Sequence, residues 1–175
     1  MAYGFGERNP VIAVYVENRP PMPQYQDLQH IQALQPADID IINSHCGNGW
    51  RKLFNVYAKL LFALHPAQFA FSQQAVSWQQ YRDQHLLQQH SGTALLFSLP
   101  DITGRTETIH LIAGRTYARK CLDAGLNCQF EWLSHEFAID RYHKVLVSPY
   151  FDYRQLTNEK ITYLAALMAS LEKAA

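Results

Sequence analysis

The chain has few cysteines, and none of them stands at a spacing that binds metal. The three cysteines are Cys46, Cys121 and Cys128. An odd number without a C-x-x-C pair favours reduced thiols, which are typical of the cytoplasm. The eight histidines form no H-E-x-x-H motif, so we predict no metal site. The sequence also lacks a G-x-G-x-x-G motif and a P-loop lysine, and we therefore expect no cofactor.

The chain also lacks an excess of either charge and any long apolar run. Lysine and arginine together number 15, as do aspartate and glutamate, so the formal net charge is zero. This balance argues against strong non-specific attraction to nucleic acid, although it allows a local basic patch. No apolar run is long enough to span a bilayer, and the first ten residues contain no apolar segment of a signal peptide. We therefore expect a cytoplasmic protein of bacterial type without a membrane partner, and the oligomeric state stays open.

The apolar content of the chain is high enough for a folded core. Hydrophobic residues make up 48% of the 175 residues and charged residues 17%, which predicts one domain over residues 1–175. Apolar and β-branched runs predict strands at residues 11–16, 93–99, 108–113, 128–133 and 144–148. Helical spacing and capping residues predict helices at residues 24–34, 36–44, 50–64, 72–90, 116–125 and from 157 onward, with a turn at 45–49. This alternation predicts a three-layer α/β/α sandwich with a short, mostly parallel central sheet.

Polar residues follow three of the predicted strands at the point where each strand ends. The turns are residues 17–20, 114–116 and 148–152, and Pro149 stops the last strand. Because the carboxyl ends of parallel strands lie at one edge of a sheet, we expect the three turns to form one ligand pocket. The candidate binding residues are Asn18, Arg19, Gly114, Arg115, Thr116, Ser148, Tyr150, Asp152 and Arg154.

Two alternative functions fit the same residues. The helix that starts after Gly114 offers free backbone N–H groups, so the pocket suits a small molecule or a phosphate ligand held by Arg115 and Arg154. A non-catalytic protein-interaction domain, with Tyr150 and Tyr153 on its surface, is the other alternative.

Basic side chains gather in two places along the chain. They are Arg51, Lys52 and Lys59 on one predicted helix and Arg115, Arg119 and Lys120 on another. With aromatic residues nearby, either group fits a nucleic-acid face. Zero net charge favours the simpler interpretation of solvated helix faces.

The layout of the chain resembles the uracil-DNA glycosylase superfamily. Proteins of that superfamily end their first strand in a G-x-N-P-like or G-Q-D-P-like loop, to which residues 16–20 are similar. Residues 48–50 are loosely similar to the superfamily's N-x-F-W segment, and residues 114–118 to its G-K-x-A-like turn. Residues 147–150 look like a variant of the H-P-S or S-P-S loop that grips DNA near the flipped base.

The resemblance implies a compact single domain with a short parallel sheet between helices, which binds nucleic acid, a nucleobase or a nucleotide. An enzyme of this type hydrolyses N-glycosidic bonds after flipping the base out of the duplex. By this analogy Asn18 is the candidate catalytic residue, which orients water. Ser148, Tyr150 and Arg154 are candidates for contacts to the backbone or the base.

Three departures from the superfamily's motifs argue against catalysis. Glu17 stands where the first loop opens with glycine, and Arg19 separates Asn18 from Pro20. The last loop has no histidine before Pro149. We therefore predict a glycosylase-like binding protein rather than an active glycosylase.

Overall fold

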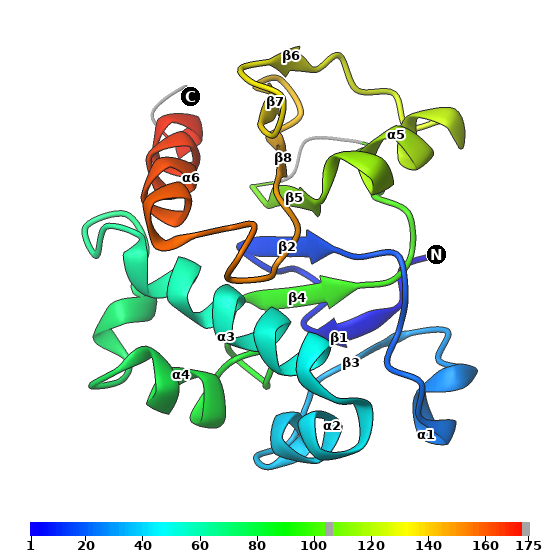
Figure 1. The fold of residues 1–175 in the computed structure, drawn as a ribbon, viewed down its shortest axis with the longest axis vertical. Helices are drawn as coiled ribbons and strands as arrows, with labels where there is room; N and C mark the ends of the chain where they lie inside the picture. The colour runs from blue at the N-terminus through cyan, green and yellow to red at the C-terminus, as the bar shows by residue number, and fades with distance from the viewer. Residues whose placement is uncertain (104–106, 173–175) are drawn as a thin grey trace.

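The computed structural model describes residues 1–103 and 107–172, which fold around an eight-stranded sheet (Figure 1). The strands are β1 Gly4–Gly6, β2 Ile12–Tyr15, β3 Ile31–Gln32, β4 Thr93–Leu96, β5 Ile109–Ala113, β6 Glu131–Trp132, β7 Ala138–Asp140 and β8 Val145–Ser148. Their order in the sheet is β3-β1-β4-β2-β5-β8-β7-β6. The four central strands β4, β2, β5 and β8 are mutually parallel, whereas β1 is antiparallel to β4 and β7 to β8. The predicted, mostly parallel sheet is confirmed, with antiparallel neighbours toward both edges.

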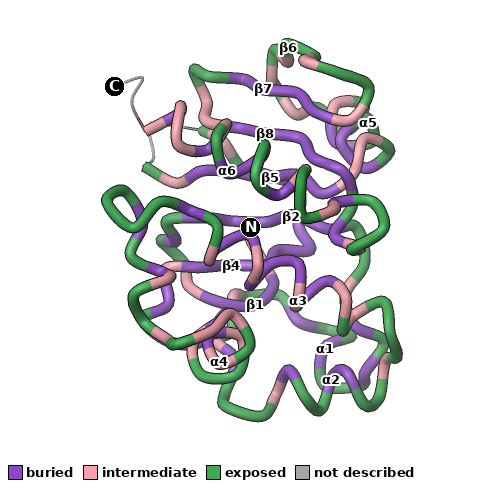
Figure 2. Tube along the Cα trace, turned by 60° about the vertical axis from the view of Figure 1, so that its left-hand side comes forward, coloured by how far each residue is buried: buried purple, intermediate pink, exposed green. Residues whose placement is uncertain are grey.

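The central strands are buried on both faces, which explains their uninterrupted apolar sequence. Every residue of β2, β4, β5 and β8 is buried, and Figure 2 shows these strands as purple tubes between green surface loops. Alternate residues serve the two faces. Val14 belongs to the larger apolar cluster on one side of the sheet, and Tyr15 to the smaller cluster on the other.

Helices cover both faces of the sheet. They are α1 Pro23–Gln26, α2 Asp38–Cys46, α3 Asn48–Ala63, α4 Trp78–Gln84, α5 Arg115–Asp123 and α6 Asn158–Glu172, with a 3₁₀ turn, η1, at Phe71–Gln73. Helices α3 and α6 pack in the larger cluster with Leu111 and Leu146, and α5 covers the other face through Tyr117, Ala118 and Cys121. This arrangement confirms the three-layer α/β/α sandwich. Within residues 1–103 and 107–172, no helix has both the length and the apolar character needed to cross a membrane.

The predicted helix over residues 24–34 is wrong beyond its first turn. Helix α1 ends at Gln26, and the chain then adds β3 to the sheet beside β1. Leu28 is buried in the core, so tertiary packing and strand pairing outweigh the helical propensity of this glutamine-rich stretch.

Two further boundaries differ from the prediction. The expected turn at residues 45–49 is mostly helical, because Gly47 alone separates α2 from α3. The expected helix over residues 72–90 is a 3₁₀ turn followed by α4, whose N-cap is Ser77 rather than Ser72. The Ser77 hydroxyl accepts the N–H of Gln80 over 3.1 Å, which starts the helix there.

Strands β1 and β7 were not predicted, and β6 is shorter than the predicted strand at 128–133. Strands β1 and β7 have three residues each, and β3, which lies in the predicted helix over residues 24–34, has two; all are too short for an alternating pattern to identify. In β1, glycine occupies two of the three positions, which disfavours a strand by propensity alone.

Candidate ligand pocket

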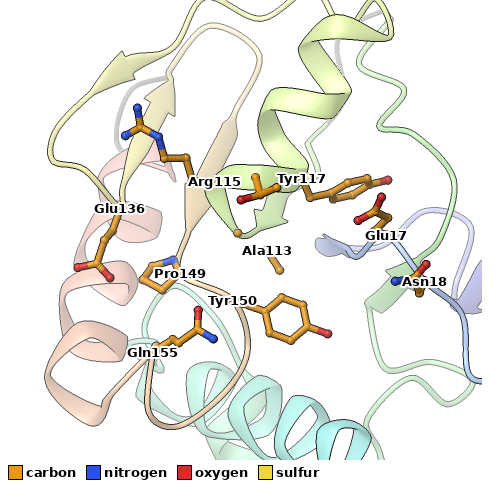
Figure 3. Close-up of a pocket in the computed structure, with 11 residues that line it drawn as sticks. Glu17, Asn18, Ala113, Arg115, Tyr117, Glu136, Pro149, Tyr150 and Gln155 are labelled. Atoms are coloured by element: carbon orange, nitrogen blue, oxygen red, sulfur yellow. The ribbon is translucent and has the colours of Figure 1, made fainter.

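Three loops meet at the carboxyl end of the parallel strands and enclose a pocket of about 350 Å³ (Figure 3). They follow β2, β5 and β8, which are neighbours in the sheet. Because adjacent parallel strands end at one edge, the loops that follow them lie together there. Five predicted site residues line the pocket, namely Asn18, Gly114, Arg115, Thr116 and Tyr150. The expected meeting of the three loops is thereby confirmed.

Gly114 holds the loop after β8 against the start of α5. Its N–H donates to the carbonyl oxygen of Ser148 over 2.8 Å. Its φ of +100° lies in the region that residues with a side chain rarely adopt. The backbone conformation, and not a lack of space, therefore requires glycine. A Cβ at this position would be in ordinary contact, 3.9 Å from the Cβ of Tyr150. Gly114 therefore sets the direction in which α5 leaves the sheet and brings Tyr150 to the wall of the pocket.

The first turn of α5 forms part of the pocket wall. The helix begins at Arg115, and its N-cap residue, Gly114, has no side chain to accept a hydrogen bond. The first N–H groups of a helix have no partner within the helix and carry the positive end of its dipole. The exposed residue Thr116 adds a hydroxyl beside them. This part of the pocket favours an anionic group such as a phosphate.

Tyr150 provides an aromatic ring inside the pocket. Figure 3 shows the ring extending from the β8 loop toward the side on which Asn18 lies. The residue is 38% exposed, so part of the ring is open to a ligand. Partial burial raises the pKa of Tyr150, and the carboxylate of Asp152 raises it further, so the phenol is neutral at physiological pH. Asn18 is exposed and offers both a donor and an acceptor from its amide.

Two acidic side chains in the pocket are already paired with lysines. The Lys120 amino group donates to Glu17 Oε1 over 2.6 Å. Lys160 donates to the two carboxylate oxygens of Glu136 over 2.7 and 2.9 Å. The lysines offset the two negative charges, which would otherwise repel an anionic ligand.

The guanidinium of Arg115 is held by the β6–β7 hairpin. It donates to the carbonyl oxygen of His135 over 2.8 Å, and it lies 4.4 Å from the ring centroid of Trp132. Figure 3 shows this group pointing away from Tyr150 and Asn18. Arg115 therefore lines the pocket near its backbone, while its charge serves contacts on the hairpin.

Arg19 does not line the pocket, although it follows Asn18. One guanidinium nitrogen donates to the carbonyl oxygens of Tyr25, Gln26 and Leu28 over 2.9, 2.7 and 3.1 Å. These carbonyls lie at and beyond the end of α1, where a helix leaves acceptors unpaired. Arg19 thus holds the loop after β2 to α1.

Three predicted site residues at and after the end of β8 also stay out of the pocket. Ser148 is fully buried, and its hydroxyl donates to the carbonyl oxygen of Pro149 over 2.9 Å. The Asp152 carboxylate lies 3.4 Å from the guanidinium of Arg154 and 3.7 Å from the amino group of Lys52. The contact with Lys52 holds Asp152 against α3. The backbone N–H of Arg154, which donates to Asp152 over 2.9 Å, and the Arg154 guanidinium hold the pKa of Asp152 below its usual value.

We expect Arg19→Ala to lower the free energy of unfolding by about 2 kcal/mol, because three carbonyl oxygens lose a charged donor. Urea unfolding of this variant beside Arg119→Ala, which changes an exposed residue of α5, measures the difference. An Arg19 variant as stable as the wild type would contradict the assigned role.

Sequence reasoning missed lining residues that lie outside the three predicted turns. Tyr117, Glu136 and Gln155 also line the pocket. Only Tyr117, one residue after Thr116 in the helix start, carried a local signal. Trp50, the aromatic residue of the segment similar to N-x-F-W, packs against Phe54 and Phe97.

The comparison with known proteins gives one match. No curated protein and no solved structure matches the chain. The model of a family of unknown function, DUF6942, matches residues 3–169, a range that includes every strand of the sheet and all three pocket loops. The chain therefore belongs to the DUF6942 family of unknown function.

Proposed function

We propose that the pocket at the carboxyl end of the sheet binds a nucleobase, carried by a nucleotide or by single-stranded nucleic acid. The observation that carries the proposal is the ring of Tyr150, which extends toward the side of Asn18 beside the start of α5. An aromatic ring stacks on any base, and an amide pairs with the donors and acceptors of a base edge. The free N–H groups of α5 suit the attached phosphate.

A basic groove next to the pocket supports a nucleic-acid ligand. The groove has a volume of about 280 Å³ and is lined by residues of α3, among them Arg51, Lys52 and Lys59, and by Tyr153. The Lys52 amino group lies 5.0 Å from the ring centroid of Tyr153. Because Tyr150 lies in the pocket and Tyr153 in the groove, only a short stretch of loop separates the two sites. A nucleic-acid strand whose base occupies the pocket would contact cationic and aromatic side chains as it continues along α3.

The resemblance to the uracil-DNA glycosylase superfamily supports the same ligand class. The loops similar to that superfamily's first, third and last motifs are the three that line the pocket. We propose binding without a catalytic step, in which Asn18 contacts the base edge instead of orienting water. The pairing of Glu17 with Lys120 and of Arg19 with the end of α1 favours this proposal, since neither group is free to act on a glycosidic bond. If the protein is an enzyme, N-glycosidic hydrolysis is the reaction to assay.

The alternative of a phosphate-bearing small molecule rests on the start of α5 alone. The two arginines considered for it are engaged elsewhere, Arg115 with His135 and Arg154 with Asp152. A protein partner at Tyr150 and Tyr153 is the third candidate. We further propose a cytoplasmic setting, in which the three free cysteines stay reduced.

We expect Tyr150→Ala to weaken binding of nucleoside monophosphates and of a short single-stranded oligonucleotide by about 10- to 100-fold, through the loss of base stacking. Titration calorimetry at low salt measures both affinities, with inorganic phosphate as the ligand that lacks a base. Tyr142→Ala is the matched control, because this tyrosine is 81% exposed on the β7–β8 turn.

The outcomes of these titrations separate the candidate functions. The affinity of the wild type for the oligonucleotide is expected to fall as the salt concentration rises. A less steep fall in Arg51→Gln supports a nucleic-acid strand that lies along α3. Phosphate bound as tightly as the nucleotides supports the small-molecule alternative. No binding of any base-bearing ligand at low salt, or equal binding by Tyr150→Ala, overturns the proposal.

A further inference from the structure

A cysteine, an aspartate and a histidine come together away from the pocket, on the hairpin side of the sheet. Cys128 lies between α5 and β6, Asp140 ends β7, and His143 lies in the turn that leads into β8. One ligand atom from each residue lies within 4.8 Å of the other two. The cluster stands before the start of β8, whereas the pocket lies beyond its end, so the two sites are separate.

The carboxylate of Asp140 is fixed in place by its neighbours. The backbone N–H groups of Gln129 and His143 each donate to it over 3.0 Å, and the ring Nδ1 of His143 lies 2.8 Å from Oδ2. Asp140 is 5% exposed, so these contacts hold it in a single orientation. A carboxylate that is already oriented by backbone donors is a preorganised ligand.

The two other side chains complete a set of sulfur, nitrogen and oxygen donors. The side chain of His143 is 25% exposed and that of Cys128 is half-buried, so an ion and a water molecule have access from solvent. The hydrogen bonds from backbone N–H groups to Asp140 are enough to stabilise the turn between β7 and β8, and this turn does not require the thiol of Cys128. The convergence of three different donors from separate segments is therefore the feature that calls for an explanation.

We propose that Cys128, Asp140 and His143 form a binding site for a divalent transition metal of the zinc class, with a fourth position open to water. Thiolate and imidazole ligands favour zinc over magnesium or calcium, which prefer all-oxygen sites. Zinc bonds of about 2.0 to 2.3 Å place ligand atoms within the spread of this cluster. On binding, Cys128 releases its thiol proton to solvent, and the neutral imidazole of His143 carries its one proton on Nε2, so that Nδ1 and the Asp140 carboxylate are free to bind the metal.

The test uses the full chain with Zn²⁺ and Co²⁺ as probes. We expect one Co²⁺ per chain and a thiolate-to-cobalt charge-transfer absorption, which Zn²⁺ displaces. Cys128→Ser is expected to abolish the absorption and to weaken Zn²⁺ binding by more than about 100-fold, because even residues that only orient a ligand cost about 10- to 100-fold. His143→Gln, which keeps a donor for Asp140, is expected to weaken binding similarly.

Cys46→Ser is the matched control, since Cys46 is a half-buried cysteine at the end of α2. Zn²⁺ is also expected to raise the melting temperature of the wild type and of the control, and not that of the two site variants. An absence of the charge-transfer absorption in the wild type overturns the proposal, as does its persistence in Cys128→Ser. Because no nucleotide takes part, these results are independent of the proposed function.

Discussion

Gly6→Ala is expected to lower the free energy of unfolding by about 4 kcal/mol. Backbone strain contributes about 1 to 3 kcal/mol of this loss, and overpacking contributes a similar amount. Gly6 has a φ of +107° and pairs with Ala94 where β1 runs antiparallel to β4. A Cβ on Gly6 would overlap the carbonyl oxygen of Thr93 and stand 2.7 Å from the Cα of Ala94. These are backbone atoms of a buried strand, so they have no room to move.

Two other glycines provide graded controls for this prediction. Gly47 has a φ of +84°, and a Cβ added there would have no atom within 4 Å, so Gly47→Ala introduces strain alone and costs about 1 to 3 kcal/mol. Gly49 lies in the first turn of α3 with free space and no positive φ, so Gly49→Ala is neutral or slightly stabilising. Urea unfolding of the three variants gives the comparison. An equal loss in Gly6→Ala and Gly47→Ala would show that β1 yields to relieve the clash.

Acidification from pH 7.5 to pH 5 is expected to lower the free energy of unfolding by about 2 kcal/mol through His110 alone. His110 is 5% exposed in β5, and the Tyr15 hydroxyl lies 2.7 Å from its Nδ1. Within the described part of the chain, its Nε2 is buried without a hydrogen-bond partner. Burial lowers the pKa of His110 from 6.5 to about 4, with a smaller lowering from His143 and an opposing effect of Asp101.

The sign of the effect follows from the two pKa values. The folded state keeps His110 neutral down to about pH 4, whereas the unfolded chain takes up a proton below about pH 6.5. The contribution to stability is therefore complete above pH 6.5, falls as the pH drops, and reaches a loss of about 3 kcal/mol below pH 4.

Urea unfolding at pH 7.5 and pH 5 tests this prediction in the wild type and in His110→Gln. The glutamine variant is expected to lose most of the difference between the two pH values. His90→Gln, which changes an exposed histidine, is expected to keep it. The lowered pKa values of Asp101, Asp140 and Asp152 lie below the usual carboxyl range, so their contribution is lost only under more acidic conditions. The same pH dependence in His110→Gln would assign the effect to other groups.

Four of the five strands that sequence patterns predicted are buried on both faces, whereas the fifth, at residues 128–133, contains the exposed strand β6. Residues 11–16, 108–113 and 144–148 contain β2, β5 and β8, and each forms a continuous apolar run because helices cover both sides. The short strands β1 and β7 lie next to the two edge strands and form through pairing with their neighbours, and three residues are too few for the sequence to show that pairing.

The candidate site was predictable in its loops and not in all of its side chains. Asn18 and Tyr150 were expected at the pocket from their positions after parallel strands, and they line it. Arg19 and Arg154 follow the same strands, yet one contacts the end of α1 and the other Asp152. The position of a residue after a strand predicts where its backbone lies, whereas the neighbouring acceptors decide where a long charged side chain binds.

By itself, the sequence determined the α/β layering and the edge at which the loops gather, because both follow from local apolar runs and from the geometry of parallel strands. Only the tertiary structure decided that Arg115 binds the hairpin rather than the pocket. It also brought Cys128 to Asp140 and His143, across a hairpin of which the sequence predicted only the first strand. Contacts of this kind join segments that are distant in sequence, and their formation depends on the packing of the whole sheet.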